Sequence, residues 1–297
     1  MGVSEAILTR EISVPASRSR TERWRDCLRQ VFERDGALEI AIPAPAGGDS
    51  EPSAGDLIWR VRILGLKDTA ILVEQPSTAG QLIDVLPGSA IIGSLSIGQN
   101  RWMFRTRVLG PRESGPCPSR SLCLEMPGTV ERCQRRNFFR VSTAELSLPS
   151  VHCWPLLDPS SVVAAEVANR AQILDLIQSP RPIDAAEDPL ILPEVGPRFN
   201  ARLMNLGGGG AGLIVDRGEA SAVDKARLFW LRINLMPQIP APIGLTARLV
   251  HTHIDSAQNL YAGTAFEWSF NTSHRDFVTQ QIIRYVRLLQ ARGTPVA

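Results

Sequence analysis

Short segments that alternate apolar and polar residues, divided by turns, constrain the fold of this chain more than any other feature of its sequence. Residues 57–63 alternate in this way, so that Arg60 and Arg62 fall on one face of an extended segment. Lys67-Asp68 and Leu86-Pro87-Gly88 are typical turns, and bulky apolar segments follow them at 69–74, 90–97 and 102–109. Strands of this length at this spacing predict a small antiparallel β-barrel.

The second half of the chain repeats the pattern around one long interruption. Residues 158–198 carry several X-Pro pairs and one helical piece at 162–177. We interpret this segment as a partly disordered insertion, because long unstructured connections are uncommon inside compact domains. The remaining strand-like segments lie at 138–141, 146–157, 199–205, 211–215, 226–236, 245–254 and 261–270.

Helical spacing of apolar residues occurs at both ends of the chain. A helix is expected over 19–34, and another closes the chain with Val278, Ile282, Tyr285, Val286 and Leu289 as its buried stripe. His274, at the start of the closing helix, is expected to be exposed. The prediction is a mainly β protein of two small antiparallel barrels, with domains at 1–128 and 129–297.

The composition favours a soluble globular protein over a nucleic-acid-binding or membrane-spanning one. A length of 297 residues with 44% apolar and 21% charged residues is typical of a soluble globular protein of two domains. The net charge of +2 is too small for a general nucleic-acid binder, and no apolar stretch reaches membrane-spanning length. No secretory signal opens the chain, so we expect a cytoplasmic protein.

Cysteine and histidine patterns give no metal or disulfide signal. The five cysteines are odd in number and form no Cys-x-x-Cys pair, so neither a disulfide framework nor a zinc site is predicted. His251 and His253 share a strand face that could suit a metal, but no third ligand is near them in the sequence. No arrangement typical of a catalytic triad or of paired catalytic carboxylates is present, so an enzyme is not expected.

Two segments can bind an anionic, hydrogen-bonding ligand. The first is Gln134-Arg135-Arg136-Asn137-Phe138-Phe139-Arg140, where planar guanidinium groups could pair with guanine edges or phosphates. Taken alone, this segment fits a solvated basic linker better than a binding site, because runs of charge usually lie on solvated faces. The second is the glycine run that starts at Asn205 and ends at Gly212, where bare backbone could approach a ligand.

The glycine run does not fit the common nucleotide-binding loops. Gly207, Gly209 and Gly212 satisfy the spacing GxGxxG, but a dinucleotide site needs a helix after the glycines. Leu213-Ile214-Val215 favours a strand instead, and no Lys-Ser or Lys-Thr pair closes a phosphate loop. A helix starting at Gly212 would support a nucleotide-dependent oxidoreductase, and a strand there would exclude it.

Taken together, the two segments resemble the motifs of PilZ-domain cyclic di-GMP receptors. Arg136 and Arg140 fit the motif RxxxR, and Asn205 and Gly210 fit the ends of (D/N)xSxxG. The strand–strand–helix ending is also similar, and residues 38–124 resemble the barrel that precedes PilZ in YcgR-like flagellar-brake proteins. Two departures stand out: Gly207 replaces the family serine, and the 158–198 insertion separates the motifs.

The resemblance implies a function and a set of site residues. Arg136 and Arg140 would hold guanine and phosphate groups, Asn205 would bond a guanine edge, and the turn from Gly207 to Gly210 would lie against the ligand. Arg135 is similar to the residue that accompanies a second, intercalated cyclic di-GMP in some members. The implied protein is a bacterial receptor without a cofactor, which changes its interdomain orientation and regulates a protein partner such as flagellar motor or envelope machinery. The alternative is a binding-deficient PilZ-type interaction module.

Overall fold

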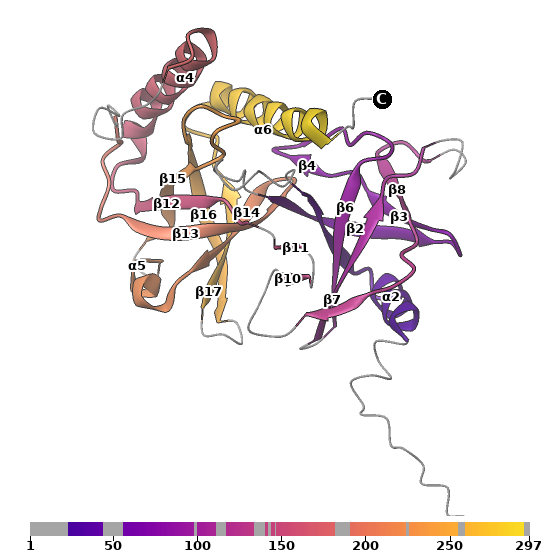
Figure 1. Cartoon of the computed structure of the whole chain (residues 1–297). Helices are drawn as coiled ribbons and strands as arrows, with labels where there is room; N and C mark the ends of the chain where they lie inside the picture. Colours follow the sequence, from indigo (N-terminus) through magenta and orange to yellow (C-terminus); the bar gives the residue numbers. More distant parts are fainter. Residues whose placement is uncertain are drawn as a thin grey trace, which may run out of the picture.

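Two β-barrels lie side by side in the computed structural model, with a long helix above them (Figure 1). The structure describes residues 23–43, 56–97, 100–110, 117–133, 140–141, 144–145, 147–181, 191–223, 226–254 and 259–293. The predicted fold class is therefore confirmed: the protein is mainly β, with helices at both ends of the described chain.

The first barrel, here called the front barrel, is built from antiparallel strands in the order β8-β3-β2-β1-β6-β7. An isolated bridge between Val108 and Leu124 links the ends of this series, after β7 and within β8. β9 pairs with the other side of β7, so the expected domain boundary at 128–129 falls just before a strand of the front sheet. The strands are β1 Ala37–Ile42, β2 Leu57–Leu66, β3 Ala70–Glu74, β6 Ala90–Ile97, β7 Asn100–Arg107, β8 Ser121–Glu125 and β9 Glu131–Cys133.

Alternation along β2 explains how the front barrel separates its core from its surface. Trp59, Val61 and Ile63 are buried, whereas Arg60 and Arg62 are exposed on the opposite face, as the sequence predicted. Helix α2 (Trp24–Glu33) packs on this barrel through Trp24 and Leu28. The small hairpin of β4 (Ser77–Thr78) and β5 (Gln81–Leu82) projects from it, and was not predicted.

The second barrel closes on itself. Its strands follow the order β12-β15-β16-β17-β14-β13, and β13 pairs back with β12. They are β12 Ser150–Pro155, β13 Phe199–Gly207, β14 Gly210–Val215, β15 Leu228–Ile233, β16 Ile243–Ile254 and β17 Leu260–Phe266. Short elements complete this half: β10 Arg140–Val141, β11 Ala144–Glu145, η1 Pro159–Ser161, η2 Arg217–Glu219 and α5 Ala220–Val223.

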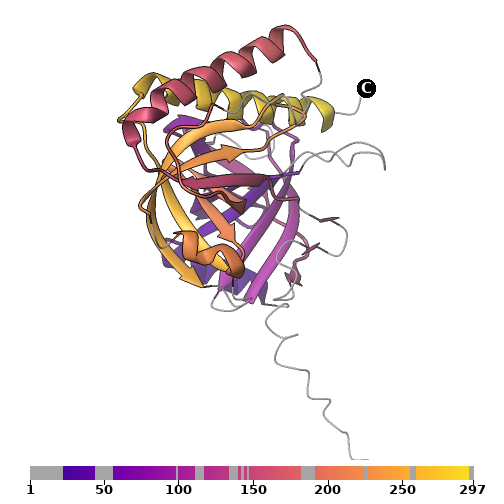
Figure 2. The ribbon, with the colours of Figure 1, turned by 90° about the vertical axis from the view of Figure 1, so that its left-hand side faces the viewer.

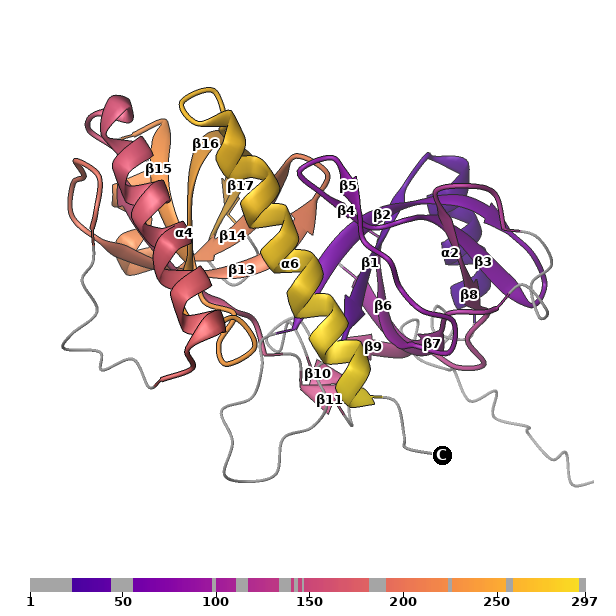
Figure 3. The same cartoon turned by 90° about the horizontal axis from the view of Figure 1, so that it is seen from above.

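Two helices lie over the second barrel (Figure 2). Helix α4 (Val162–Gln178) provides the helical piece expected within the insertion, of which residues 182–190 lie outside the described residues. Helix α6 (Thr272–Gly293) extends from the second barrel toward the front barrel when viewed from above (Figure 3). All five residues of the predicted stripe on α6 are buried.

The prediction that His274 is exposed is wrong. Only 2% of this residue is exposed, and its Nε2 lies 2.7 Å from the Gly244 carbonyl oxygen of β16. The first turn of α6 lies against the end of the barrel, which buries the ring. Burial accordingly lowers the pKa of His274.

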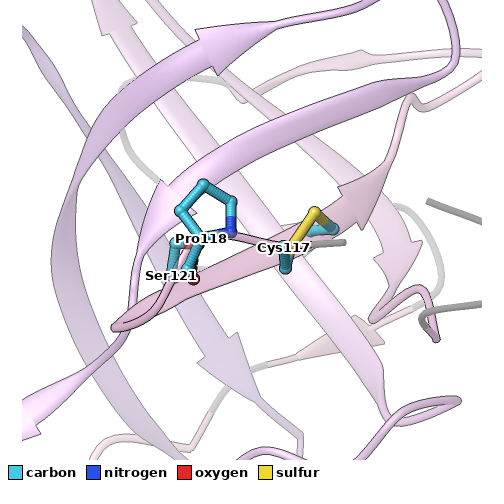
Figure 4. Close-up of a disulfide and its surroundings, with 4 residues drawn as sticks. Cys117, Pro118 and Ser121 are labelled. Carbon is cyan, nitrogen blue, oxygen red and sulfur yellow. Dashed lines mark hydrogen bonds between the residues drawn. A yellow bond between two sulfur atoms is a disulfide. The ribbon is translucent and has the colours of Figure 1, made fainter. Parts of the chain in front are cut away.

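The expectation of no disulfide is also wrong. Cys117 and Cys123 are bonded in the front barrel, with their Cα atoms 6.5 Å apart (Figure 4). Ser121 Oγ donates a hydrogen bond to the Pro118 carbonyl oxygen at 2.6 Å. This turn folds the chain back so that Cys117 lies beside Cys123 of β8. The search for Cys-x-x-Cys pairs missed this disulfide because its cysteines are six positions apart.

Candidate ligand-binding site

The predicted arginine residues are only partly within the described structure. Arg135 and Arg136 lie outside the described residues. The backbone of Arg140 begins β10 and pairs with Glu145 of β11. The site can therefore be built from its glycine-turn half and from the residues that surround it.

The glycine run forms a tight antiparallel hairpin. β13 ends at Gly207 and β14 begins at Gly210, which leaves Gly208 and Gly209 as the turn. Gly212 lies inside β14, paired with Asn205 and Gly263. Because a strand occupies the place where a dinucleotide site needs a helix, the oxidoreductase alternative is excluded for this loop.

Gly207 and Gly210 differ in the space around them. A Cβ atom added at Gly210 would lie 1.9 Å from the Thr264 carbonyl oxygen, so only glycine fits there. At Gly207 the nearest atom would be the Gly210 carbonyl oxygen at 4.0 Å. The residue that departs from the family pattern is thus the one with room for a side chain.

Asn205 lies at the seam where the two barrels meet. Its Nδ2 donates a hydrogen bond to Glu39 Oε1 of β1 at 3.3 Å, and it is 9% exposed. On the same seam, Leu206 of β13 pairs in parallel with Trp59 of β2. The two barrels therefore share one sheet at the position of the predicted guanine-binding residue.

Glu39 was not predicted and is the central charge of the seam. Its Oε2 forms an ion pair with Arg101 of β7, and Arg101 Nε donates to Ser94 Oγ of β6 at 2.7 Å. The sequence held one signal for it: Glu39 is the single charge on β1, at an alternating position between the buried Leu38 and Ile40. Its partner Asn205 is too distant in the chain for such a pattern to reveal.

Tyr261 of β17 completes the polar group around Asn205. Burial raises the pKa of Tyr261, while a hydrogen bond with Asn205 opposes that shift. A Cβ at Gly212 would lie 2.3 Å from the Tyr261 hydroxyl, so that glycine makes room for the tyrosine.

Next to Tyr261, His253 and His251 continue a row of rings along the sheet. The His253 and Tyr261 ring centroids are 4.5 Å apart, and the two histidine rings are stacked at 6.3 Å. No group of three or more His, Cys, Asp or Glu residues within the described segments could hold a metal ion.

A second contact between the barrels forms at the glycine turn itself. The amide of Gly80, in the β4–β5 hairpin, donates to the Gly208 carbonyl oxygen at 2.8 Å. Arg275 of α6 donates two hydrogen bonds to the Ala79 carbonyl oxygen, at 2.8 and 2.5 Å. The turn, the hairpin and the closing helix are thereby connected.

Comparison with known protein families gives a match for the front barrel. Residues 37–127 match the family model PilZNR, described as Flagellar protein YcgR. The matched segment starts with β1 and ends just after β8, so it spans the front barrel. The match agrees with the YcgR-like resemblance predicted for this half. No protein with a curated description matches the chain.

Several solved structures are similar to the chain at low identity. One is the Bacillus subtilis inhibitor of motility MotI/DgrA, with 13% identity, 86% of this chain and 97% of that chain covered, and a TM-score of 0.28. Another is K. pneumonia MrkH in complex with c-di-GMP, with 10% identity, 92% and 97% covered, and a TM-score of 0.28. A third is Escherichia coli YcgR with c-di-GMP, with 14% identity, 90% of each chain covered, and a TM-score of 0.27.

Proposed function

We propose that this protein is a cyclic di-GMP receptor that changes the relative orientation of its two barrels when the ligand binds. The single observation that carries the proposal is the position of Asn205. It lies at the seam and already contacts Glu39 of the other barrel. A ligand held by Asn205 would therefore meet both barrels.

The ligand-binding residues in this proposal come from both motifs. Arg135, Arg136 and Arg140 supply guanidinium groups for guanine edges and phosphates. Asn205 bonds a guanine edge, and the turn from Gly207 to Gly210 presents backbone to the ligand. The match of residues 37–127 to the YcgR family model supports the class of receptor, and the site residues rest on the two motifs. We propose no catalytic role and no cofactor.

The proposed output is the control of a protein partner in a motility or envelope process. Ligand at the seam would compete with the hydrogen bond between Asn205 and Glu39, which links the two barrels. None of the helices in the described segments is long and apolar enough to cross a membrane. We place the receptor in the cytoplasm, where a cyclic dinucleotide and the inner face of envelope machinery are both available.

A second candidate function is a PilZ-type interaction module that no longer binds the nucleotide. The observation that favours it is Gly207, where the family serine and its hydrogen bond are absent. The two candidates differ in their response to restoring that serine, which is taken up in the Discussion.

The proposal is tested by measuring cyclic di-GMP affinity in Asn205→Ala. Loss of a hydrogen bond to a guanine edge should weaken binding by about tenfold or more. Asn200→Ala is the matched control, because Asn200 lies on the same strand but bonds Glu219, away from the seam. Equal affinities for the natural chain and Asn205→Ala would remove Asn205 from the site.

A further inference from the structure

A pocket in the front barrel lies beside the seam. It has a volume of about 370 Å³ and lies between α2 and the strands β1, β2 and β6. Volumes of this size suit a small metabolite or part of a nucleotide. The residues that line it are Gln30, Val31, Arg34, Gly36, Ala37, Glu39, Arg60, Ser94 and Ser96.

Two arginine side chains in the lining of this pocket could bind an anion. Arg34 and Arg60 contribute guanidinium groups from α2's C-terminal cap and from β2. Within the described part of the chain, neither side chain forms an ion pair or a hydrogen bond. Arg60 faces Glu39 directly in the strand register, yet no ion pair joins them. Both guanidinium groups are therefore free to bind an anion.

The carboxylate in the pocket is already neutralised. Glu39 forms its ion pair with Arg101 and accepts a hydrogen bond from Asn205. The pocket thus keeps a positive balance from Arg34 and Arg60. Ser96 and Gln30 add neutral hydrogen-bonding groups, as phosphate recognition requires.

A pocket on the other side of α2 provides a contrast. Its volume is about 320 Å³, and its cations Arg25, Arg29 and Lys67 share the lining with the carboxylates of Glu33 and Asp68. The linings of both pockets sum to a formal charge of +1, from three cations and two carboxylates there and from two cations and one carboxylate on the seam side. The seam-side pocket differs because its one carboxylate, Glu39, is already paired with Arg101, which does not line the pocket.

We propose that the pocket between α2 and strands β1, β2 and β6 is a second ligand site, which binds the phosphate group of a small phosphorylated metabolite or nucleotide. Arg34 and Arg60 hold the phosphate oxygens, and Ser96 and Gln30 bond the rest of the ligand. The inference does not require cyclic di-GMP binding at Asn205. The bound group also lies next to Glu39, the carboxylate that links the two barrels.

The test is a calorimetric titration of the full chain with inorganic pyrophosphate. Saturable binding is expected, and Arg34→Gln and Arg60→Gln should each weaken it by about tenfold, the effect of a lost charge-assisted hydrogen bond. Both side chains are exposed, so circular dichroism should show unchanged folding. Arg29→Gln is the matched control, since it lies on the same helix but lines the other pocket.

Three results would overturn the inference. These are no saturable heat with pyrophosphate, affinity unchanged in both arginine variants, and equal weakening in Arg29→Gln, which would indicate general attraction of anions. A parallel titration with cyclic di-GMP identifies the source of the phosphate. If Arg34→Gln weakens both ligands, the site takes a phosphodiester of the cyclic dinucleotide. If it weakens pyrophosphate alone, the site takes a separate phosphorylated ligand.

Discussion

Asn205 has hydrogen-bond partners in both barrels, and this arrangement determines which single residues matter for ligand binding. Glu39 accepts from its amide across the seam, and Tyr261 bonds it from the neighbouring strand β17. In the proposed receptor, a guanine edge held by Asn205 would have to replace at least the bond to Glu39. The affinity of the protein for a ligand at this site therefore includes the cost of releasing Asn205 from Glu39.

Gly207→Ser is expected to strengthen cyclic di-GMP binding by about tenfold or more, because a hydrogen bond to a charged group contributes roughly 1.5–3 kcal/mol. The position has room for the side chain, with no atom closer than 4.0 Å to the new Cβ. Titration calorimetry on the natural chain and the variant measures the change.

Gly210→Ser is the control for that substitution. Its Cβ would lie 1.9 Å from the Thr264 carbonyl oxygen, so it should destabilise the barrel instead of improving binding. A Gly207→Ser variant that folds normally but binds no ligand would favour the interaction-module alternative.

A single residue could be assigned to the candidate site from the sequence only where it was part of a motif. Asn205 and Gly210 stood at fixed spacings in one strand and its turn, and the structure places both at the hairpin beside the seam. Glu39 was not predictable as a partner of this site. Its proximity to Asn205 depends on the packing of two barrels, and the two residues are separated by 166 positions in the sequence.

At the scale of elements, α4 is joined to the second barrel through a buried carboxylate. Glu166 is 2% exposed, and Thr246 Oγ1 of β16 donates a hydrogen bond to its Oε1 at 3.4 Å. Burial raises the pKa of Glu166 from 4.5 to about 7, although hydrogen bonds with Asn271 and Thr246 oppose the shift. The protonated acid is thus the form that the folded protein prefers.

This preference predicts a pH dependence of stability. The contribution of protonated Glu166 to the free energy of unfolding is complete below pH 4.5 and is lost as the pH rises to about 7. Glu166→Gln keeps a neutral side chain, so its stability relative to the natural chain should increase across that range and stay level above it. Urea unfolding at several pH values measures the difference.

His274 changes the pH dependence of stability in the opposite direction, but it does not affect the comparison of the natural chain with Glu166→Gln. Its pKa is lowered from 6.5 by burial, so its contribution is lost as the pH falls below that value. Both proteins contain His274, and its effect therefore cancels in the difference. A constant difference between the natural chain and Glu166→Gln at all pH values would contradict the assignment to Glu166.

Elements were more predictable than contacts between them. Alternation identified β2, and helical spacing identified the stripe of α6, because both patterns repeat over many residues. The β4–β5 hairpin was missed because its strands contain two residues each, too few for a periodic pattern. The hairpin connects the front barrel to the glycine turn through the bond from Gly80 to Gly208.

For the whole molecule, three sets of contacts among the described residues hold the barrels in their relative orientation. One is the seam, where Glu39 contacts Asn205 and β2 pairs with β13. The second is the glycine turn, where the amide of Gly80 bonds the Gly208 carbonyl oxygen. The third is α6, which extends toward the front barrel (Figure 3). It bonds that barrel through Arg275 at Ala79 and through Gln290 at Asp84. A ligand that reorients the barrels must disturb at least one of these sets, and the seam and the glycine turn are the two that contain predicted ligand-binding residues.

The overall arrangement could not be derived from the sequence. Two barrels followed from the spacing of strands, but neither the shared sheet nor the bridging position of α6 has a local pattern. Both depend on which apolar faces meet after each barrel has formed.

Calorimetric titration of the natural chain with cyclic di-GMP, alongside Arg136→Ala, tests the central claim most directly. We expect saturable heat for the natural chain and loss of that heat in Arg136→Ala, because the RxxxR arginine would supply charge-assisted hydrogen bonds to the ligand. Absence of heat for the natural chain at high micromolar ligand would contradict the receptor function. Equal binding by both proteins would contradict the role of Arg136.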